Sequence, residues 1–393
     1  MAVLIRGAHV HAPQSLGRRD VLVAGGKVEA IAEPGLIRTA GVEVRTIEGD
    51  GRLLLPGLID SHVHILGGGG EGGPATRAPE ISVEDIVRSG LTTVIGCLGT
   101  DGITRHMASL LAKARALEVE GVSTFIFSGS YEVPVKTITG SVRSDLVLID
   151  KVIGAGEIAV SDHRSSQPTF EEIARLAAEC RVGGLLGGKA GILHLHLGDG
   201  RRGLEFLVRL MTETEIPPSQ VMPTHLNRNR RLLEEGIAYV LAGGYMDLTV
   251  GTKPEEESAA DVSVESAVRA CVEKGVPLDR LTVTSDGNGS KPVFDGRGAL
   301  AGLTIASTKD LFRTFQSLVR REILTLEQAA RLFALNPAEF YKLAGKGRIR
   351  EGSDADLILL DQDLNLTAVI AKGRVMMAEG KLEASGTFRE PPA

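Results

Sequence analysis

The chain has 393 residues, of which 43% are hydrophobic and 24% are charged, and its formal net charge is -6. This length accommodates one large domain and a smaller one, and the acidic balance argues against partners such as nucleic acid or an anionic membrane. No apolar run approaches the roughly 20 residues of a membrane-spanning helix, and no basic stretch followed by an apolar one opens the sequence. A cytoplasmic protein is therefore expected.

The three cysteines, Cys97, Cys180 and Cys271, stand in separate apolar or helical contexts without the short spacing of a zinc-thiolate motif. We expect buried free thiols at all three positions. Tryptophan is absent and aromatic residues make up only 4% of the chain, so nothing indicates stacking on bases or sugars.

Short β-like segments open the chain, and a similar texture returns only near its end. The first group covers residues 3–5, 20–24, 27–32 and 42–47, and the second covers residues 355–360, 367–371, 373–377 and 380–382. Their alternation of apolar and polar residues predicts a small antiparallel sheet. We expect the two ends to pair into one small β domain, residues 1–56 plus 347–393, around a larger domain of residues 57–346.

The middle of the chain repeats an apolar strand, a loop and an amphipathic helix. Strands are predicted at residues 58–64, 92–98, 123–128, 157–162, 192–197, 221–226, 245–250 and 281–286, with helices between them at 82–89, 105–120, 144–153, 170–180, 203–212, 231–241 and 258–274. Eight such units predict an α/β fold, a (β/α)8 TIM-type barrel, with an open doubly wound sheet as the alternative. Catalytic groups of such barrels sit at the C-terminal strand ends.

Histidines dominate those strand ends. His62 and His64 end the first strand and leave the same face at i and i+2, His196 ends the fifth strand and His225 the sixth, and Asp286 ends the eighth. An isolated His-x-His pair is more often a hydrogen-bonded core pair, but the whole set fits a divalent ion of the zinc, manganese or iron type. His194 points the same way one step deeper, so we expect it to pack below the site or support a ligand.

These segments also carry family motifs. Residues 56–64, the strand-end histidines, Asp286 and a β domain built from both termini resemble the amidohydrolase superfamily. Residues 67–71, 129–134, 137–141, 161–165, 181–189, 224–229 and 285–290 are similar to the isoaspartyl (β-aspartyl) dipeptidases within it. The resemblance covers essentially the whole chain, and it implies hydrolysis of the isopeptide bond of β-aspartyl dipeptides by a homo-oligomeric enzyme.

An isoaspartyl dipeptide carries one ammonium and two carboxylates, and the loops offer groups of opposite charge. Glu71 suits the ammonium, and Arg164 and Arg228 present planar forks that suit carboxylates. An isolated arginine is more often a surface salt-bridge residue, but these two follow strands that carry expected metal ligands. The resemblance implies that the substrate-binding residues are Glu71 and Arg164 at the aspartyl end, Arg228 at the leaving residue, and Ser290, Gly69 and Thr100.

The resemblance also implies a mechanism. Two divalent ions, with zinc as the expected metal, are bound by the four histidines and Asp286, and a metal-bound hydroxide is the nucleophile. Asp286 takes the proton of the hydroxide and passes it to the leaving amine. Tyr131 polarises the scissile carbonyl, although without the family it reads equally well as an ordinary half-buried tyrosine.

One position departs from the family pattern. The family bridges its metals with a carboxylated lysine just upstream of residues 161–164, whereas this chain has Glu157 there and no lysine nearer than Lys151. Glutamate supplies the same bidentate anion but is shorter, so the centre is either binuclear through Glu157 or effectively mononuclear. The structural alternative for Glu157 is a solvent-facing residue at the start of a strand.

Two other functions remain open on the sequence. The first is another amidohydrolase reaction, such as opening a cyclic amide or cleaving an N-acyl amino acid, with substrates that leave Glu71 or one arginine unused. The second is a binding scaffold without catalysis, which is disfavoured because every expected ligand except the lysine is present. The glycine-rich residues 183–190 lack the Ser/Thr and the following helix of a phosphate-binding loop, so no nucleotide is expected.

Overall fold

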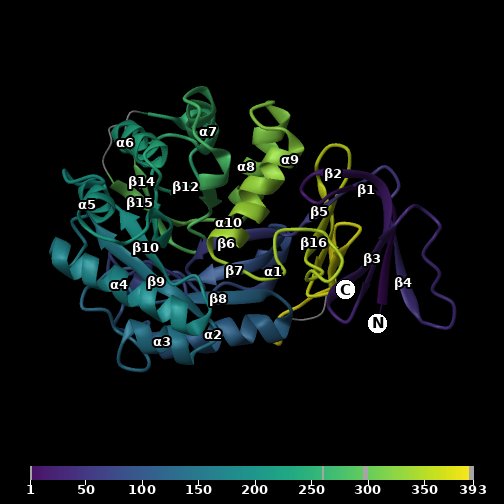
Figure 1. Cartoon of the computed structure of the whole chain (residues 1–393), viewed down its shortest axis with the longest axis horizontal. Helices are drawn as coiled ribbons and strands as arrows, with labels where there is room; N and C mark the ends of the chain where they lie inside the picture. Colours follow the sequence, from purple (N-terminus) through teal and green to yellow (C-terminus); the bar gives the residue numbers. More distant parts are fainter. Residues whose placement is uncertain (1, 259–260, 295–299, 389–393) are drawn as a thin grey trace.

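The computed structural model describes residues 2–258, 261–294 and 300–388. Figure 1 shows two β systems side by side, a barrel surrounded by helices and a sheet that contains both ends of the chain. Within those three ranges, none of the helices has both the length and the apolar composition needed to cross a bilayer.

Eight parallel strands follow one another around the barrel. They are β6 (Leu58–Val63), β7 (Leu91–Gly96), β8 (Ser123–Ser128), β9 (Val152–Val160), β10 (Ile192–Leu197), β11 (Val221–Thr224), β12 (Met246–Thr249) and β13 (Leu281–Thr284). The first six form one continuous sheet, and β12 pairs with β13. Two backbone hydrogen bonds link these sheets, from Leu226 N to Asp247 O (3.2 Å) and from His64 N to Gly287 O (2.8 Å). The predicted TIM-type barrel is confirmed.

Helices cover the outside of the barrel. They are α1 (Val83–Arg88), α2 (Met107–Glu120), α3 (Val142–Leu148), α4 (Phe170–Gly187), α5 (Glu205–Glu213), α6 (Arg230–Leu241), α7 (Val264–Glu273), α8 (Lys309–Arg320), α9 (Leu326–Ala330) and α10 (Asn336–Phe340). Local sequence fixes where they begin. The Thr169 hydroxyl accepts a hydrogen bond from Glu172 N while the Glu172 carboxylate accepts one from Thr169 N, which is a capping box at the start of α4.

Apolar side chains fill the barrel interior at the N-terminal ends of its strands. Ile59, Phe127, Ile192 and Met222 point inward from four different strands and are buried there. Tyr341, directly after α10, packs against this cluster with its ring centroid 5.8 Å from that of Phe127. The N-terminal end of the barrel is therefore a packed core, which leaves the opposite end for polar chemistry.

The second sheet joins both ends of the chain. It contains β1 (Ala2–His11), β2 (Ser15–Ala24), β3 (Lys27–Ala32), β4 (Val44–Glu48), β5 (Leu53–Pro56), β16 (Leu357–Leu360), β17 (Leu366–Ala371), β18 (Arg374–Ala378) and β19 (Lys381–Leu382). The central pair β5 and β16 is antiparallel, but β4 and β5 both run parallel to β1. The prediction of an antiparallel sheet is therefore confirmed for the other strand pairs and wrong for these two, in which β4 pairs with the first half of β1 and β5 with its last residues.

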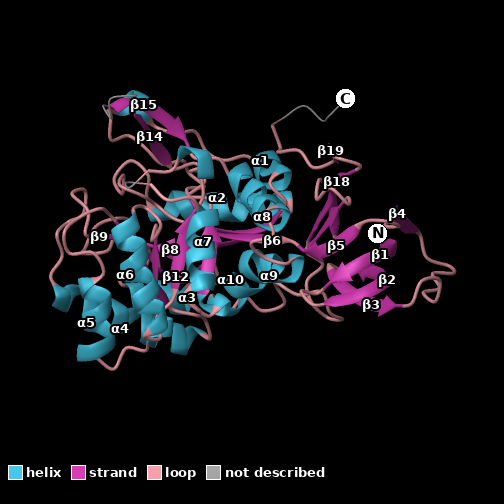
Figure 2. Ribbon diagram, turned by 90° about the horizontal axis from the view of Figure 1, so that it is seen from above, coloured by secondary structure: helices cyan, strands magenta, loops and turns pink. Residues whose placement is uncertain are grey.

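Three local predictions are also corrected. The fourth barrel strand begins at Val152 rather than at residue 157, so the helix expected at 144–153 ends at Leu148. Helix α4 runs to Gly187 and absorbs part of the glycine-rich segment. A hairpin of β14 (Ser290–Phe294) and β15 (Leu300–Ile305), which the sequence did not indicate, projects beyond the barrel in Figure 2.

A buried ion pair fastens the barrel to the terminal sheet. The Lys346 ammonium lies 2.5 Å from Asp356 Oδ2 and 2.8 Å from Asp354 Oδ2, and it donates to Ser123 Oγ at the start of β8. Lys346 and Asp356 are both buried. We expect Lys346→Met to lower the free energy of unfolding by about 3–5 kcal/mol, because it leaves the Asp356 carboxylate buried and without its cation.

The measurement is urea unfolding followed by circular dichroism. Lys372→Met is the matched control, since Lys372 pairs with Glu118 at 2.7 Å but both side chains are about one-third exposed. An exposed pair of this kind contributes less than about 1 kcal/mol. Equal effects of the two substitutions would contradict the structural role given to Lys346.

Candidate metal centre and active site

Glu157 lies at the centre of the polar end of the barrel, where β9 places its carboxylate among four histidines. Its Oε2 faces the first strand, 3.2 Å from His62 Nε2 and 3.7 Å from His64 Nε2. Its Oε1 faces the fifth and sixth strands, 2.6 Å from His196 Nδ1 and 3.2 Å from His225 Nε2. One carboxylate thus lies between two pairs of imidazoles, the position of a ligand that bridges two ions.

The donor atoms fit divalent ions. Two groups meet the spacing of a metal site, His62, His64, Cys97 and Glu157 in one and Glu157, His196 and His225 in the other. Within the described residues, His62 Nε2, Glu157 Oε2 and Asp286 Oδ1 are buried atoms without a hydrogen-bond partner. Since such atoms are costly to bury unless they bind something, the arrangement suits a cation.

The eighth strand adds a second carboxylate. Asp286 follows β13 with a left-handed backbone (φ 51°), and its Oδ1 lies 2.9 Å from His64 Nε2 and 3.6 Å from His62 Nε2. Burial disfavours its charge, but the adjacent imidazoles of His64 and His62 together lower the pKa of Asp286 to about 2. Asp286 is therefore an anion at neutral pH and can accept a proton.

Electrostatics keep the central carboxylate ionised as well. Burial opposes the charge, but the positive charges of His62 and His196 hold the pKa of Glu157 well below its usual value. The pKa of His225 falls to about 3, because the ring is buried and lies near His196 and Arg228. A neutral imidazole and an anionic carboxylate are the protonation states that metal ligands require.

Neighbouring side chains orient three of the imidazole rings. His225 Nδ1 lies 2.7 Å from Thr249 Oγ1, and His196 Nε2 lies 3.0 Å from Asp162 Oδ2. His62 Nδ1 is 3.3 Å from His194 Nε2, so His194 contacts one of the expected ligands. Such partners fix the tautomer and direct the other ring nitrogen toward the centre.

Three of the expected substrate-binding residues gather around one carboxylate at the mouth of the site. Thr100 Oγ1 donates to Glu71 Oε1 at 2.8 Å, and Ser290 Oγ donates to Glu71 Oε2 at 3.2 Å. Gly69 lies beside them in a left-handed conformation (φ 79°), and a Cβ there would lie 2.4 Å from Thr76 O. The loop therefore needs glycine at position 69 for its left-handed backbone and its close approach to Thr76.

The glycine-rich loop is anchored from below. The buried Arg105 guanidinium donates to Leu66 O at 3.1 Å, Gly69 O at 3.4 Å and Ala78 O at 2.8 Å. Residues 65–69 are themselves buried. This part of the loop is therefore held in place, because one arginine donates hydrogen bonds to three carbonyls, those of Leu66, Gly69 and Ala78.

The two arginines predicted for substrate carboxylates differ in their partners. Arg164 forms a bidentate pair with Asp162, at 3.0 and 2.8 Å, and its Nη1 lies 3.7 Å from Glu71 Oε1. Arg228 donates through Nε to Leu197 O at 3.1 Å, and no carboxylate in the described part of the chain pairs with it. The Arg228 fork is therefore the more available of the two.

Tyr131 follows the third strand and reaches the same centre. Its hydroxyl lies 2.9 Å from His196 Nδ1, and its ring centroid lies 5.4 Å from the Arg164 guanidinium carbon. Burial and the Glu157 charge raise the pKa of Tyr131 well above its usual value. The phenol therefore keeps its proton and remains a hydrogen-bond donor.

Comparison with known proteins identifies the family to which this chain belongs. The amidohydrolase family model matches residues 53–376. The crystal structure of a β-aspartyl dipeptidase from Fervidobacterium islandicum AW-1, in complex with a β-Asp-Leu dipeptide, superimposes with a TM-score of 0.92, 46% identity and coverage of 99% of each chain. This chain belongs to the β-aspartyl dipeptidases of the amidohydrolase family. It is a hydrolase, and the sequence-based assignment to this family is confirmed.

Other relatives of this amidohydrolase are more distant. A second β-aspartyl dipeptidase structure from Fervidobacterium islandicum AW-1 has a TM-score of 0.90 and 44% identity, covering 99% of this chain and 100% of the other. A dihydroorotase of Listeria monocytogenes serotype 4a (strain HCC23) is 23% identical over 93% of this chain and 90% of its own length.

Two residues near the centre of this amidohydrolase were not assigned from the sequence. Asp162 contacts both His196 and Arg164, and Cys97 lies with its sulfur 3.7 Å from His64 Nδ1. All three cysteines are free and buried as predicted, but only Cys97 lies within a metal-ligand group of the described residues. Their position two residues or fewer beyond strands β9 and β7 is the signal that could have identified them.

Proposed function

We propose that the chain hydrolyses the isopeptide bond of β-aspartyl dipeptides with the help of two divalent metal ions. The observation that carries the proposal is the position of Glu157, with one oxygen toward His62 and His64 and the other toward His196 and His225. The β-aspartyl dipeptidase of Fervidobacterium islandicum AW-1 was solved with β-Asp-Leu, which supports the choice of substrate.

Charge complementarity supports the same substrate. The Glu71 carboxylate, flanked by Thr100 and Ser290, would accept the substrate ammonium. The Arg228 fork would bind the carboxylate of the leaving residue, and Arg164 Nη1 would bind the α-carboxylate of the aspartyl unit. An α-linked dipeptide places its aspartyl carboxylate elsewhere, so one guanidinium would lose its partner and selectivity would follow.

Side chains of this protein would transfer the proton from the attacking water to the leaving amine. Bound divalent ions would activate a water molecule and polarise the scissile carbonyl. Asp286 would take one proton from the attacking water and deliver it to the nitrogen of the leaving amino acid as the C–N bond breaks. The Tyr131 hydroxyl, which lies 2.9 Å from His196 Nδ1, would donate to the carbonyl oxygen as negative charge develops there.

Three further parts of the proposal rest on the family resemblance and on ligand chemistry. Zinc is the proposed metal, because imidazole and carboxylate donors suit it. A homo-oligomeric assembly and a cytoplasmic location are proposed from the resemblance alone.

The decisive experiment compares β-Asp-Leu with α-Asp-Leu as substrates for the purified, zinc-supplemented protein. Release of leucine is measured over time, together with the zinc content of each sample. We expect cleavage of the β-linked isomer only. If neither dipeptide is cleaved at full metal occupancy, the proposal fails, and cyclic amides become the next substrates because dihydroorotases are among the relatives.

Arg228 provides a more specific prediction. We expect Arg228→Met to reduce kcat/KM for β-Asp-Leu by about 10–100-fold, mainly through KM, because a charge-assisted hydrogen bond contributes about 1.5–3 kcal/mol. Arg230→Met is the matched control, since Arg230 is exposed at the start of α6 only two residues away. An unchanged KM for Arg228→Met would remove this residue from the substrate site.

A further inference from the structure

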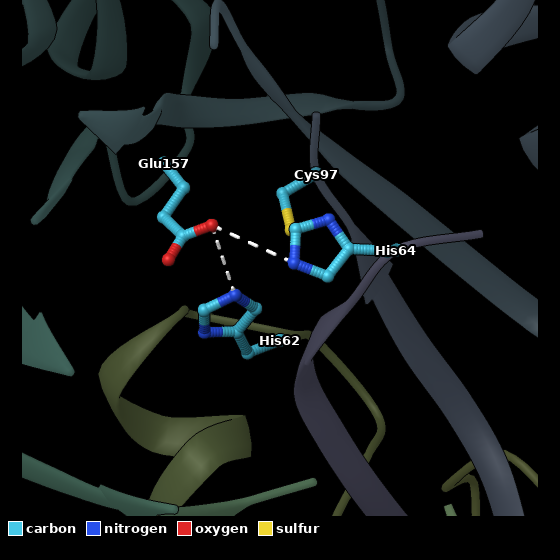
Figure 3. Close-up of side chains that lie close together, drawn as sticks. All are labelled: His62, His64, Cys97 and Glu157. Atoms are coloured by element: carbon cyan, nitrogen blue, oxygen red, sulfur yellow. Dashed lines mark hydrogen bonds and ion pairs between the residues drawn. The ribbon is translucent and has the colours of Figure 1, made fainter. Parts of the chain in front are cut away.

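Cys97 stands closer to the centre than a packing role requires. It directly follows β7, its side chain is 1% exposed, and its Sγ lies 3.7 Å from His64 Nδ1 and 3.7 Å from Val63 O. Its sulfur and one donor atom each of His62, His64 and Glu157 all lie within 4.8 Å of one another. Figure 3 shows these four side chains converging from three strands of the barrel.

The spacing can be compared with the edges of a tetrahedral site. Zinc bonds of about 2.3 Å to sulfur and about 2.0–2.1 Å to nitrogen or oxygen place a sulfur and a nitrogen ligand about 3.5 Å apart, and a nitrogen and an oxygen ligand about 3.3 Å apart. His62 Nε2 lies 3.2 Å from Glu157 Oε2, whereas Cys97 Sγ lies 3.7 Å from His64 Nδ1, the ring nitrogen that does not face Glu157. One donor atom of each of the four side chains lies within 4.8 Å of the others, so the four would have to draw closer together to reach one ion.

Glu157 also lies at unequal distances from the two pairs of histidines. Glu157 Oε1 lies 2.6 Å from His196 Nδ1, whereas Oε2 is 3.2 and 3.7 Å from the nitrogens of His62 and His64. The bridging carboxylate is therefore drawn toward His196 and His225. Asp286 Oδ1, 2.9 Å from His64 Nε2, is one anionic donor on the side of His62 and His64, and Cys97 is placed to supply another.

We propose that Cys97 binds, as a thiolate, the divalent ion held by His62 and His64. The inference rests on the proposed metal centre and adds a ligand to it. On binding, the thiol loses its proton to solvent and a sulfur–metal bond forms. This half of the centre then has nitrogen, oxygen and sulfur donors and favours Zn²⁺, Co²⁺ and Cd²⁺ over Mn²⁺ and Mg²⁺, while the half with His196 and His225 has only nitrogen and oxygen donors.

Cobalt substitution tests the ligand directly. The metal-free protein is titrated with Co²⁺ alone, and the absorption spectrum is recorded. We expect a sulfur-to-cobalt charge-transfer band in the near ultraviolet for the wild type. Cys180→Ser and Cys271→Ser are matched controls, because both thiols are equally buried but lie in α4 and α7, outside the metal-ligand groups. The band should persist in both controls and disappear in Cys97→Ser.

Metal selectivity gives a second readout that a packing role would not change. Loss of a supporting partner of a metal ligand weakens metal binding by about 10–100-fold, so loss of a direct ligand should cost at least as much. We expect the Kd for Cd²⁺ to rise by that factor in Cys97→Ser, with a much smaller change for Mn²⁺. Equal losses for the two metals would overturn the proposal.

The wild type alone also decides the question, should Cys97→Ser fail to fold. Cadmium-113 NMR of the Cd²⁺-loaded protein should show one signal shifted downfield by sulfur and one in the range of nitrogen and oxygen ligands. Two signals of the latter kind, in a protein that cleaves β-Asp-Leu, would reject the sulfur ligand and leave the proposed function intact. A protein that binds no cobalt or cadmium would reject both.

Discussion

Replacing Asp286 with asparagine is expected to lower kcat for β-Asp-Leu by about 10²–10⁴-fold, with little change in KM. Asparagine has nearly the same shape but cannot accept the proton of the attacking water, and loss of a general acid–base group costs a factor of this size. The wild-type carboxylate suits the task because the neighbouring histidines lower the pKa of Asp286 to about 2, so it is ionised at neutral pH.

The control for Asp286→Asn flanks the same strand at its other end. Asp279 belongs to the short turn at Leu278–Arg280 that precedes β13, at the opposite end of the barrel from Asp286. Asp279→Asn should leave kcat unchanged. Both variants are to be assayed at measured metal content, because Asp286 is also a candidate ligand. A metal-loaded Asp286→Asn protein with more than a tenth of wild-type kcat would exclude the proposed proton transfer.

Replacing Glu157 with glutamine is expected to affect both halves of the centre at once. The amide removes the negative charge that faces His62, His64, His196 and His225, so the four imidazoles lose their common counter-charge. We expect metal content to fall from two ions per chain to one or none, and kcat/KM to fall by at least about 100-fold. Metal content is measured by atomic absorption after gel filtration.

The Glu157→Asp variant distinguishes the effect of the negative charge from the effect of side-chain length. It keeps the carboxylate but shortens the side chain, so it should retain one ion and lose the other, whichever pair the shorter group no longer approaches. Full retention of two ions by Glu157→Gln would show that Glu157 does not bridge, and the effectively mononuclear alternative would then need to be assigned to one histidine pair.

The barrel and most of the centre could be predicted because their signals are local. Each strand is an apolar run, and the residues His62, His64, His196 and His225 interrupt such runs at their ends. Parallel strands of a barrel all present their C-terminal ends at one mouth, so these residues had to meet. The repeat of apolar strands along the chain and the positions of the histidines at their ends were therefore sufficient to predict that these side chains lie together.

The remaining features depend on contacts that the sequence does not encode locally. The fourth strand starts at Val152 because Gly154 packs against the next strand, where a Cβ would lie 2.3 Å from Ile192 O. The pairing of Asp162 with both His196 and Arg164 depends on how β9 and β10 are aligned. The nearness of Cys97 to His64 depends likewise on the alignment of β6 and β7.

The order of strands in the terminal sheet has a consequence for biosynthesis. Only Gly57 separates β5 from β6, and β5 pairs with β16, a strand that begins 299 residues after β6 does. While the chain emerges from the ribosome, the β5 edge therefore stays open until nearly the entire protein has been made. An unpaired edge is a template for association with other chains, so this edge is exposed to such pairing until β16 has been synthesised.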